Sequence, residues 1–236
     1  YDVIDLKYIH NKEGFVYYLA SPDNATQKYL YKTKLNGKGK NELLSPASLK
    51  GSHDYSFSSN GNYAAHTFSN HFTPYSKEFI SIANHKALTE EESILKNVKK
   101  LEEKPTTEFF TITTTDNVEL DGWMVKPTNF DPNKKYPVVF YVYSEPASTT
   151  VNDTYYTSKN RLYNGDMAED GYIYISLDNR GTPSPKGREW RKSIYRKIGV
   201  ININDQAMAA KEILKWNFVD SERVAVWGWS GGGSAT

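Results

Sequence analysis

The sequence predicts a β-rich N-terminal region followed by an α/β region with a largely parallel sheet. Up to about residue 82, short runs alternate aromatic with small or polar residues, as half-buried antiparallel strands do. After Pro105 the strand candidates are continuously apolar, which is typical of strands covered on both faces. A helical pattern from Asp205 to Trp216 then leads into the apolar run Val224–Val226. Strand, helix and strand in this order indicate a parallel arrangement.

The composition fits a folded protein and excludes several classes of partner. The 236 residues are 38% hydrophobic and 14% aromatic, which is enough to fill a core. There are 29 basic and 28 acidic residues without large blocks of one sign, so no nucleic-acid partner is expected. The absence of cysteine excludes disulfides, thiolate metal ligands and a cysteine nucleophile. No apolar run predicts a membrane span, and the first residues lack both Met and a leader, so we expect the chain to begin within a domain.

Two hairpins define the expected architecture of residues 1–83. The first joins Gly14–Ala20 to Lys28–Thr33 through a Ser-Pro-Asp-Asn turn. The second joins Tyr55–Ser58 to Tyr63–Phe68 through an Asn-Gly turn. Units of this kind suit the blades of a β-propeller, and the stretch is too short to close a ring. We therefore predict the C-terminal part of a propeller domain.

Residues 84–105 are predicted to be a connecting helix and linker. Thr89 and Glu92 have the spacing of a capping box, and Pro105 would end the helix. The apolar positions with helical spacing are Ile94, Leu95, Val98 and Leu101. We interpret the acidic start, 90–92, as stabilising the helix dipole rather than as a ligand for an amine.

The most specific motif lies near the last residue, where the apolar strand 223–227 runs into Gly228-Trp229-Ser230-Gly231-Gly232. Gly-x-Ser-x-Gly directly after a strand indicates a nucleophile elbow, a strained strand-to-helix turn that exposes a serine hydroxyl. A flexible linker is the alternative, because 231–234 reads Gly-Gly-Gly-Ser. The preceding strand favours the elbow.

The elbow and the βαβ pattern predict that residues 106–236 form the N-terminal part of an α/β-hydrolase domain, truncated just after its nucleophile. The further strands expected in this region are 109–113, 118–125, 136–143 and 172–177, of which 136–143 and 172–177 should be buried on both faces. The apolar face of its helix would consist of Ala207, Ala210, Ile213 and Leu214.

A serine nucleophile needs a base, and no histidine stands where this fold would need one. The acid and the base of an α/β-hydrolase triad follow the serine in the sequence. All histidines precede it and are expected to be surface or packing residues: His10, His53, His66, His71 and His85. Either the base lies beyond Thr236 or the protein has no triad.

Two groups are candidates for the oxyanion hole. The backbone N–H of Gly231, directly after the nucleophile, is the expected first donor. The phenol of Tyr143, at the end of an apolar strand, could donate the second bond, although in a chain with 18 tyrosines core or rim packing is the favoured explanation on spacing alone. After the next strand, Asp178-Asn179-Arg180-Gly181 stands where ligands bind in open α/β sheets, and a turn explains it equally well. We favour an Arg180 that anchors this loop through a carboxylate over one that contacts substrate directly. No nucleotide or metal motif is present, so no cofactor and no metal are predicted.

Taken together, separated motifs make this sequence similar to the dipeptidyl peptidase IV branch of the prolyl oligopeptidase family. The similarity covers nearly the whole chain and is closest after Pro105. The motifs are Lys135-Tyr136-Pro137 leading into Tyr141–Tyr143, Asp178-x-Arg180-Gly181, Arg196-Lys197-Ile198-Gly199 followed by Asp205-Gln206, Phe218–Trp227, and Gly228-Trp229-Ser230-x-Gly232-Gly233.

The resemblance implies a serine exopeptidase that releases N-terminal dipeptides, with peptides as substrates and proline or alanine preferred at the second residue. It implies Ser230 as nucleophile, with the Tyr143 hydroxyl and the Gly231 N–H as oxyanion donors. The triad Asp and His and the paired glutamates that bind the substrate amine would lie outside this chain, so the fragment alone is expected to be inactive. A homodimer and a periplasmic or exported bacterial location are further expectations.

Two departures from the family pattern concern the substrate pocket. Gly231 and Ser234 stand where relatives have aromatic residues, and Ser144-Glu145-Pro146 stands where they have Gly-Gly-Pro or a close variant. A glycine at 231 would widen the pocket, and a carboxylate at 145 would oppose an oxyanion unless it points away. Two alternatives therefore stay open: a non-catalytic propeller-hydrolase protein used for binding, and a related acylaminoacyl peptidase or esterase.

Overall fold

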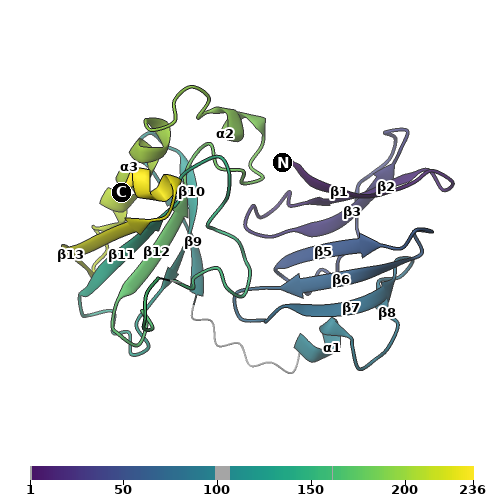
Figure 1. The fold of residues 1–236 in the computed structure, drawn as a ribbon, viewed down its shortest axis with the longest axis horizontal. Helices are drawn as coiled ribbons and strands as arrows, with labels where there is room; N and C mark the ends of the chain where they lie inside the picture. The colour runs from purple at the N-terminus through teal and green to yellow at the C-terminus, as the bar shows by residue number, and fades with distance from the viewer. Residues whose placement is uncertain (1, 99–106, 161) are drawn as a thin grey trace. The chain divides into compact units, whose positions relative to one another are not determined.

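A computed structural model describes residues 2–98, 107–160 and 162–236 of the chain. The chain forms two compact units, which are drawn in Figure 1. The first unit consists of Tyr1–Lys104 and Asn152–Tyr155, and the second of Pro105–Val151 and Tyr156–Thr236. Among the described residues, no helix is long and apolar enough to span a bilayer.

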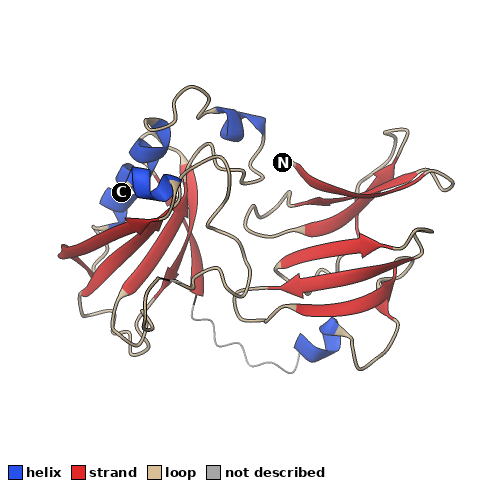
Figure 2. Cartoon of the chain, in the orientation of Figure 1, coloured by secondary structure: helices blue, strands red, loops and turns tan. Residues whose placement is uncertain are grey.

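The first unit contains two four-stranded antiparallel sheets, in which each strand pairs with the next along the sequence (Figure 2). One sheet consists of β1 (Val3–His10), β2 (Phe15–Ala20), β3 (Tyr29–Lys34) and β4 (Glu42–Leu43), and the other of β5 (Ser52–Phe57), β6 (Tyr63–Ser69), β7 (Ser76–Ser81) and β8 (Lys86–Ala87). This confirms the prediction of propeller-like sheets in the N-terminal region.

Aromatic side chains join the two sheets of the first unit. The rings of Tyr8 and Phe57 stack with centroids 5.2 Å apart and an interplanar angle of 3°. Residues from both sheets share one core cluster, which includes Tyr17, Leu30 and Ile80. The predicted Asn-Gly turn is present between β5 and β6. Burial alternates along β6 and β7, whereas β2 is buried at the four consecutive positions Tyr17–Ala20.

The segment Asn152–Tyr155 is part of the first unit, although the residues on both sides of it belong to the second. Asp153 is 3% exposed. Its carboxylate accepts hydrogen bonds from the backbone N–H of His71 at 2.8 Å and from Gln27 Nε2 at 2.8 Å. Its own N–H donates to the carbonyl of Thr26 at 2.7 Å. These contacts fix the segment against loops of the first unit.

The connecting helix begins later than the sequence predicted. Helix α1 spans Ile94–Val98, so Thr89 is not its cap. The carbonyl of Ser93 accepts a hydrogen bond from Asn97, and the N–H of Ile94 donates to Glu78 Oε2 at 3.0 Å. The buried Glu78 carboxylate therefore fixes the start of the helix at Ile94. The predicted continuation through Leu101 to Pro105 lies outside the described residues.

A chain of buried polar side chains crosses the second sheet of the first unit. His53 Nε2 hydrogen-bonds the carbonyl of Leu49 at 2.9 Å, which requires a proton on that nitrogen. His53 Nδ1 and His66 Nε2 are 2.9 Å apart, and His66 Nδ1 and Glu78 Oε1 are 2.7 Å apart. If both imidazoles are neutral, His66 donates to His53 and Glu78 must carry the last proton. Burial lowers the pKa of both histidines to about 3 and raises the pKa of Glu78, which favours this neutral arrangement.

His85 gives this network a pH dependence that can be measured. Burial, reinforced by the nearby His66, lowers the pKa of His85 to about 4, so the folded state binds fewer protons than the unfolded state between about pH 6.5 and 4. The contribution of His85 to the free energy of unfolding is fully present above pH 6.5. As the pH is lowered from 6.5 to 4, the free energy of unfolding decreases by up to about 1.4 kcal/mol per pH unit for each proton.

The variant His85→Asn tests this pH dependence. His85 has φ 51°, which asparagine tolerates. We expect His85→Asn to make the pH dependence of the opening free energy shallower, as measured by hydrogen exchange of the backbone amides of β5–β7. An unchanged pH dependence would contradict a contribution from His85.

The second unit is built on a five-stranded mixed sheet with the order β13-β11-β12-β10-β9. Its strands are β9 (Thr107–Thr113), β10 (Glu119–Val125), β11 (Tyr136–Val142), β12 (Ile173–Asp178) and β13 (Val219–Gly228). β11, β12 and β13 are parallel, as predicted, whereas the hairpin of β9 and β10 joins β12 in antiparallel orientation. The carboxyl ends of the three parallel strands therefore share one edge of the sheet.

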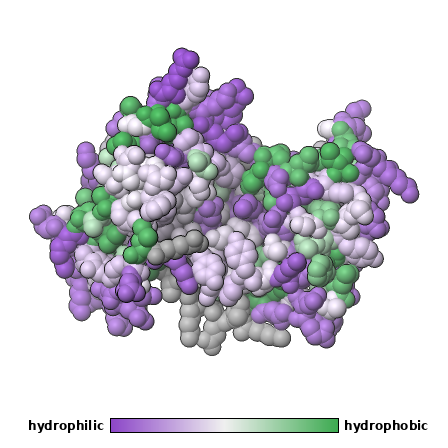
Figure 3. All heavy atoms as spheres, in the orientation of Figure 1, coloured by the Kyte–Doolittle hydropathy of each residue, from purple (hydrophilic) through white to green (hydrophobic). Residues whose placement is uncertain are grey.

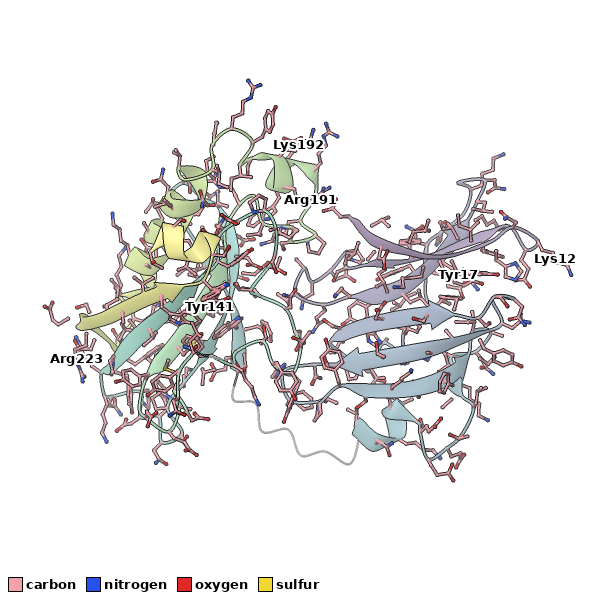
Figure 4. All side chains as sticks on the ribbon, viewed as in Figure 1. Lys12, Tyr17, Tyr141, Arg191, Lys192 and Arg223 are labelled. Atoms are coloured by element: carbon pink, nitrogen blue, oxygen red, sulfur yellow. The ribbon has the colours of Figure 1, made fainter. Side chains whose placement is uncertain are left out.

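Burial within this sheet corrects two expectations. β12 is buried at every position, as predicted, but β11 alternates between buried and half-buried residues. β13 was expected to be a buried type of strand, yet it lies at the end of the strand order, and Val224 and Val226 are exposed. Towards its end, Trp227 stacks on Tyr141 of β11 with ring centroids 4.7 Å apart. Figure 4 labels Tyr141 on the sheet and Arg223 near the outer end of β13.

Helix α3 covers the sheet with a face that only partly matches the predicted one. It spans Ile201–Ile213 and buries Asn202, Asp205, Ala209 and Ile213, whereas Ala207 is exposed. Ala210 and Leu214, also predicted, pack partly buried against the core. The buried face of the helix is rotated from the predicted face because it includes two polar residues, Asn202 and Asp205, as well as apolar ones. The shorter helices of this unit are α2 (Arg188–Lys192) and α4 (Gly231–Ala235).

Hydrophobic side chains also reach the surface of the described residues. Figure 3 shows them as separate green patches on a largely hydrophilic face. In the second unit, exposed examples are Tyr195, Ile198 and Val200 between α2 and α3, and Trp229, which is 67% exposed, beside the serine of the motif.

Candidate functional site

The Gly-x-Ser-x-Gly motif forms a strand-turn-helix. β13 ends at Gly228, and α4 begins at Gly231. Ser230, between them, has φ 54° and ψ −120°, a backbone conformation that is strained for a residue with a side chain. The turn leaves Ser230 exposed while Gly231 and Gly232 are buried. A linker is ruled out for this segment, because it has a defined turn against the sheet.

The two glycines that flank the turn are required by close backbone contacts. A Cβ at Gly228 would lie 2.3 Å from the carbonyl carbon of Gly232. A Cβ at Gly232 would lie 1.9 Å from the carbonyl oxygen of Val142, at the end of β11. Neither position has space for a side chain. The spacing of the motif is thus explained by the packing of the first turn of α4 against two neighbouring strand ends.

The loop after β11 lies beside the elbow because the two strands are in register. Val142 pairs with Gly228, so the segments that follow the two strands begin side by side. The Cα of Tyr143 would lie 3.0 Å from a Cβ at Gly232. Ser230, Gly231 and Tyr143 are therefore brought to the same edge of the sheet, although they are far apart in the sequence.

Polar contacts hold the start of this loop. Ser144 is 2% exposed and has φ 63°, a second strained residue beside the elbow. Its Oγ accepts a hydrogen bond from Asn202 Nδ2 at 3.2 Å, and its carbonyl accepts one from Asn179 Nδ2 at 3.3 Å. Residues from β12's loop and from α3 thus fix the backbone that carries Tyr143.

Asp178, at the end of β12, holds the far end of the same loop. Its carboxylate accepts hydrogen bonds from the N–H groups of Thr150 at 2.8 Å and Val151 at 3.2 Å. Burial raises the pKa of Asp178 to about 6, and these backbone bonds oppose the rise. Trp123 Nε1 donates to the Thr150 carbonyl at 2.9 Å. The sequence placed Asp178 in a turn, and the structure assigns it this anchoring role.

Arg180 anchors its turn through a carboxylate, as predicted. Its guanidinium contacts Asp205 of α3 through Nη2 at 2.6 Å and Nε at 3.0 Å, and its backbone N–H donates to the same carboxylate at 2.9 Å. Asp205 is fully buried. A second carboxylate, Asp116, accepts from Nη2 at 2.8 Å. These bonds raise the pKa of Arg180 and hold α3 against the end of β12.

Sequence reasoning missed the partners of these anchors. The sequence motif contains Asp205 without revealing its role, and no motif marks Asn202, which supports Ser144. A polar residue four positions before a buried apolar one, on the same helix face, is the signal that could have found Asp205. The side chains of Ser144 and Glu145 gave no sign of their placement, which depends on the register of β11 and β13.

Among the described residues, one cluster offers three side chains that could ligate a metal: His66, Glu78 and His85 in the first unit, with ligand atoms within 4.8 Å of one another. Both ring nitrogens of His66 are already hydrogen-bonded, and His85 Nε2 is 2.7 Å from the hydroxyl of Tyr55. Hydrogen bonds within the sheet account for this cluster, and we assign it a structural role.

Two family models match the chain. The model described as the prolyl oligopeptidase family matches residues 159–236, and the model of the dipeptidyl peptidase IV N-terminal region matches residues 1–75. An α/β sheet with a strained serine elbow and a preceding pair of propeller-like sheets define the class: a protein that joins propeller-like sheets to a hydrolase-type mixed sheet. The chain belongs to the prolyl oligopeptidase family, in its dipeptidyl peptidase IV branch.

Relatives and solved structures agree with this family. The chain is 32% identical over 240 residues to a probable dipeptidyl-aminopeptidase B of Neurospora crassa, and 30% identical over 238 residues to a probable dipeptidyl peptidase 4 of Emericella nidulans. Both matches cover 100% of this chain, but only 25% and 30% of the relatives. The crystal structure of Porphyromonas gingivalis dipeptidyl peptidase 4 superimposes with a TM-score of 0.81 at 33% identity, covering 100% of this chain and 32% of that one.

Proposed function

We propose that the full-length protein is a serine-type exopeptidase that releases N-terminal dipeptides from peptides through an acyl-enzyme on Ser230. The observation that carries the proposal is the elbow: Ser230 has φ 54° on an exposed turn between β13 and α4. Such strain at a nucleophile is maintained only where the surrounding structure enforces it, and here two close-packed glycines do so.

In the proposed mechanism, the hydroxyl of Ser230 attacks the carbonyl carbon of the second substrate residue. Negative charge develops on the carbonyl oxygen, where the N–H of Gly231 and the hydroxyl of Tyr143 would stabilise it. The bond to the leaving amine then breaks, the dipeptide remains as an ester on Ser230, and water hydrolyses it. A base that takes the serine proton is expected beyond Thr236, so we propose that residues 1–236 alone are inactive. A homodimer and an exported location remain predictions.

A non-catalytic binding protein is the second candidate, and one contact favours it. The side chain of Glu145 lies against Gly231, whose N–H is a proposed oxyanion donor. A carboxylate at this position disfavours an oxyanion.

Labelling with a fluorophosphonate distinguishes the two candidates. We expect folded full-length protein to form one adduct, which peptide mapping places on Ser230, and to release dipeptides from N-terminally free peptide anilides. Ser230→Ala should lose both, while Ser221→Ala, an exposed serine of β13, should keep both. If wild type gives no adduct and no dipeptide, the peptidase assignment is wrong and the binding protein is favoured.

A further inference from the structure

Glu145 fills the space next to the residue that follows the nucleophile. A Cβ built on Gly231 would lie 1.8 Å from Cδ, 2.2 Å from Cγ and 2.2 Å from Oε1 of Glu145. Val142 and Gly228 pair at the ends of their strands, so the loop that carries Glu145 and the first turn of α4 begin side by side. The carboxyl group therefore occupies the position that any side chain at 231 would take.

Gly231 and Glu145, one residue from each departure noted in the sequence, thus form one structural feature. A large side chain at 231 and a glutamate at 145 could not be present together without one of them moving. Glycine at 231 makes room for the glutamate, and the glutamate takes up the volume that the glycine leaves. A wall of the site beside Ser230 is consequently acidic.

The charge of this wall has a consequence for the reaction. Oxyanion stabilisation depends on donors such as the Gly231 N–H, and a carboxylate against the same residue opposes the developing negative charge. A positively charged group on the substrate would offset this repulsion and would itself pair with the carboxylate. The group best placed to do so belongs to the substrate residue whose carbonyl is attacked, because that residue lies beside Ser230 and Gly231.

We propose that Glu145 is a specificity-determining residue that selects substrates with a lysine or arginine side chain at the residue whose carbonyl Ser230 attacks. The proposal rests on the proposed function, since it concerns the same acyl site. It assigns to this site a cationic substrate class in place of the proline or alanine that the family resemblance implies.

The test compares full-length wild type with Glu145→Gln on four anilides: Gly-Lys, Gly-Arg, Gly-Ala and Gly-Pro p-nitroanilide. Wild type is expected to have the larger kcat/KM on the two basic substrates. Glu145→Gln is expected to lower the ratio of Gly-Lys to Gly-Ala by about tenfold to a hundredfold, as for loss of a close charge pair. Activity on Gly-Ala should be kept or rise, which shows that the variant folds. Glu169→Gln, at an exposed position of the same unit, is the matched control and should keep the wild-type ratio.

A second variant tests the contact itself. Gly231→Ala should displace the Glu145 side chain and reduce the preference for basic substrates, and the double variant with Glu145→Gly should show no basic preference. An unchanged Gly-Lys to Gly-Ala ratio in Glu145→Gln would overturn the proposal. So would faster cleavage of lysine p-nitroanilide than of Gly-Lys p-nitroanilide, since Glu145 would then bind an α-amine. Failure of the proposed function looks different: no anilide is cleaved and Ser230 is not labelled.

Discussion

Gly232→Ala is expected to remove most of the peptidase activity of the full-length protein. Its Cβ would lie 1.9 Å from the Val142 carbonyl oxygen, which is part of strand β11 and has no freedom to move aside. The first turn of α4 would have to shift, and the Gly231 N–H would shift with it. Loss of one oxyanion donor lowers kcat by about 10²- to 10³-fold. Fluorophosphonate labelling rates and kcat on peptide anilides measure the effect.

Gly233→Ala is the matched control for this prediction. It lies in the same helix, but a Cβ there would contact only the Gly228 carbonyl oxygen, at 3.4 Å. This variant should keep activity within a few fold of wild type. If Gly232→Ala were as active as Gly233→Ala, the close contact between the elbow and β11 would not matter for catalysis.

Asp205→Asn is expected to destabilise the second unit by about 3 kcal/mol or more. Asp205 is fully buried and pairs with Arg180 through Nε, Nη2 and the backbone N–H. Removing one partner of a buried ion pair costs about 3 to 5 kcal/mol, and Arg180 would keep only the more exposed carboxylate of Asp116. All five tryptophans of the chain lie in the second unit, so urea unfolding followed by tryptophan fluorescence reports on it.

The other carboxylate on Arg180 provides the comparison. Asp116 binds the same guanidinium, but its side chain is 44% exposed. Exposed ion pairs contribute about 1 kcal/mol or less, so Asp116→Asn should shift the urea midpoint much less than Asp205→Asn. Equal shifts for the two variants would show that burial of Asp205 does not determine the strength of the pair.

Most strands and turns of the fold could be predicted from the sequence, because local residue patterns determine them. Alternating aromatic residues predicted the β-rich unit, and the glycine spacing around Ser230 predicted a turn whose φ of 54° follows from close backbone packing. The face of α3 was not predictable in the same way. Its burial depends on Asn202 and Asp205, polar residues that become favourable inside only when Ser144 and Arg180 reach them.

The position of Glu145 shows the same limit at the site. The sequence named its carboxylate as unfavourable unless it points away from the oxyanion hole, and in the structure it lies against Gly231. The contact between Glu145 and Gly231 depends on the pairing of β11 with β13. These strands are far apart in the sequence, since β11 ends at Val142 and β13 begins at Val219. Register between distant strands is a property of the assembled sheet, so no local pattern reveals it.

The placement of Asn152–Tyr155 in the first unit affects the order in which the protein can form as it is synthesised. The hydrogen bonds that Asp153 makes to His71, Gln27 and Thr26 cannot exist when Lys104 leaves the ribosome. Domains generally fold as units, beginning from the N-terminus. Here the loops around Gln27 and His71 must wait until β9, β10 and β11 have been made, so the first unit is completed only while the second is already growing.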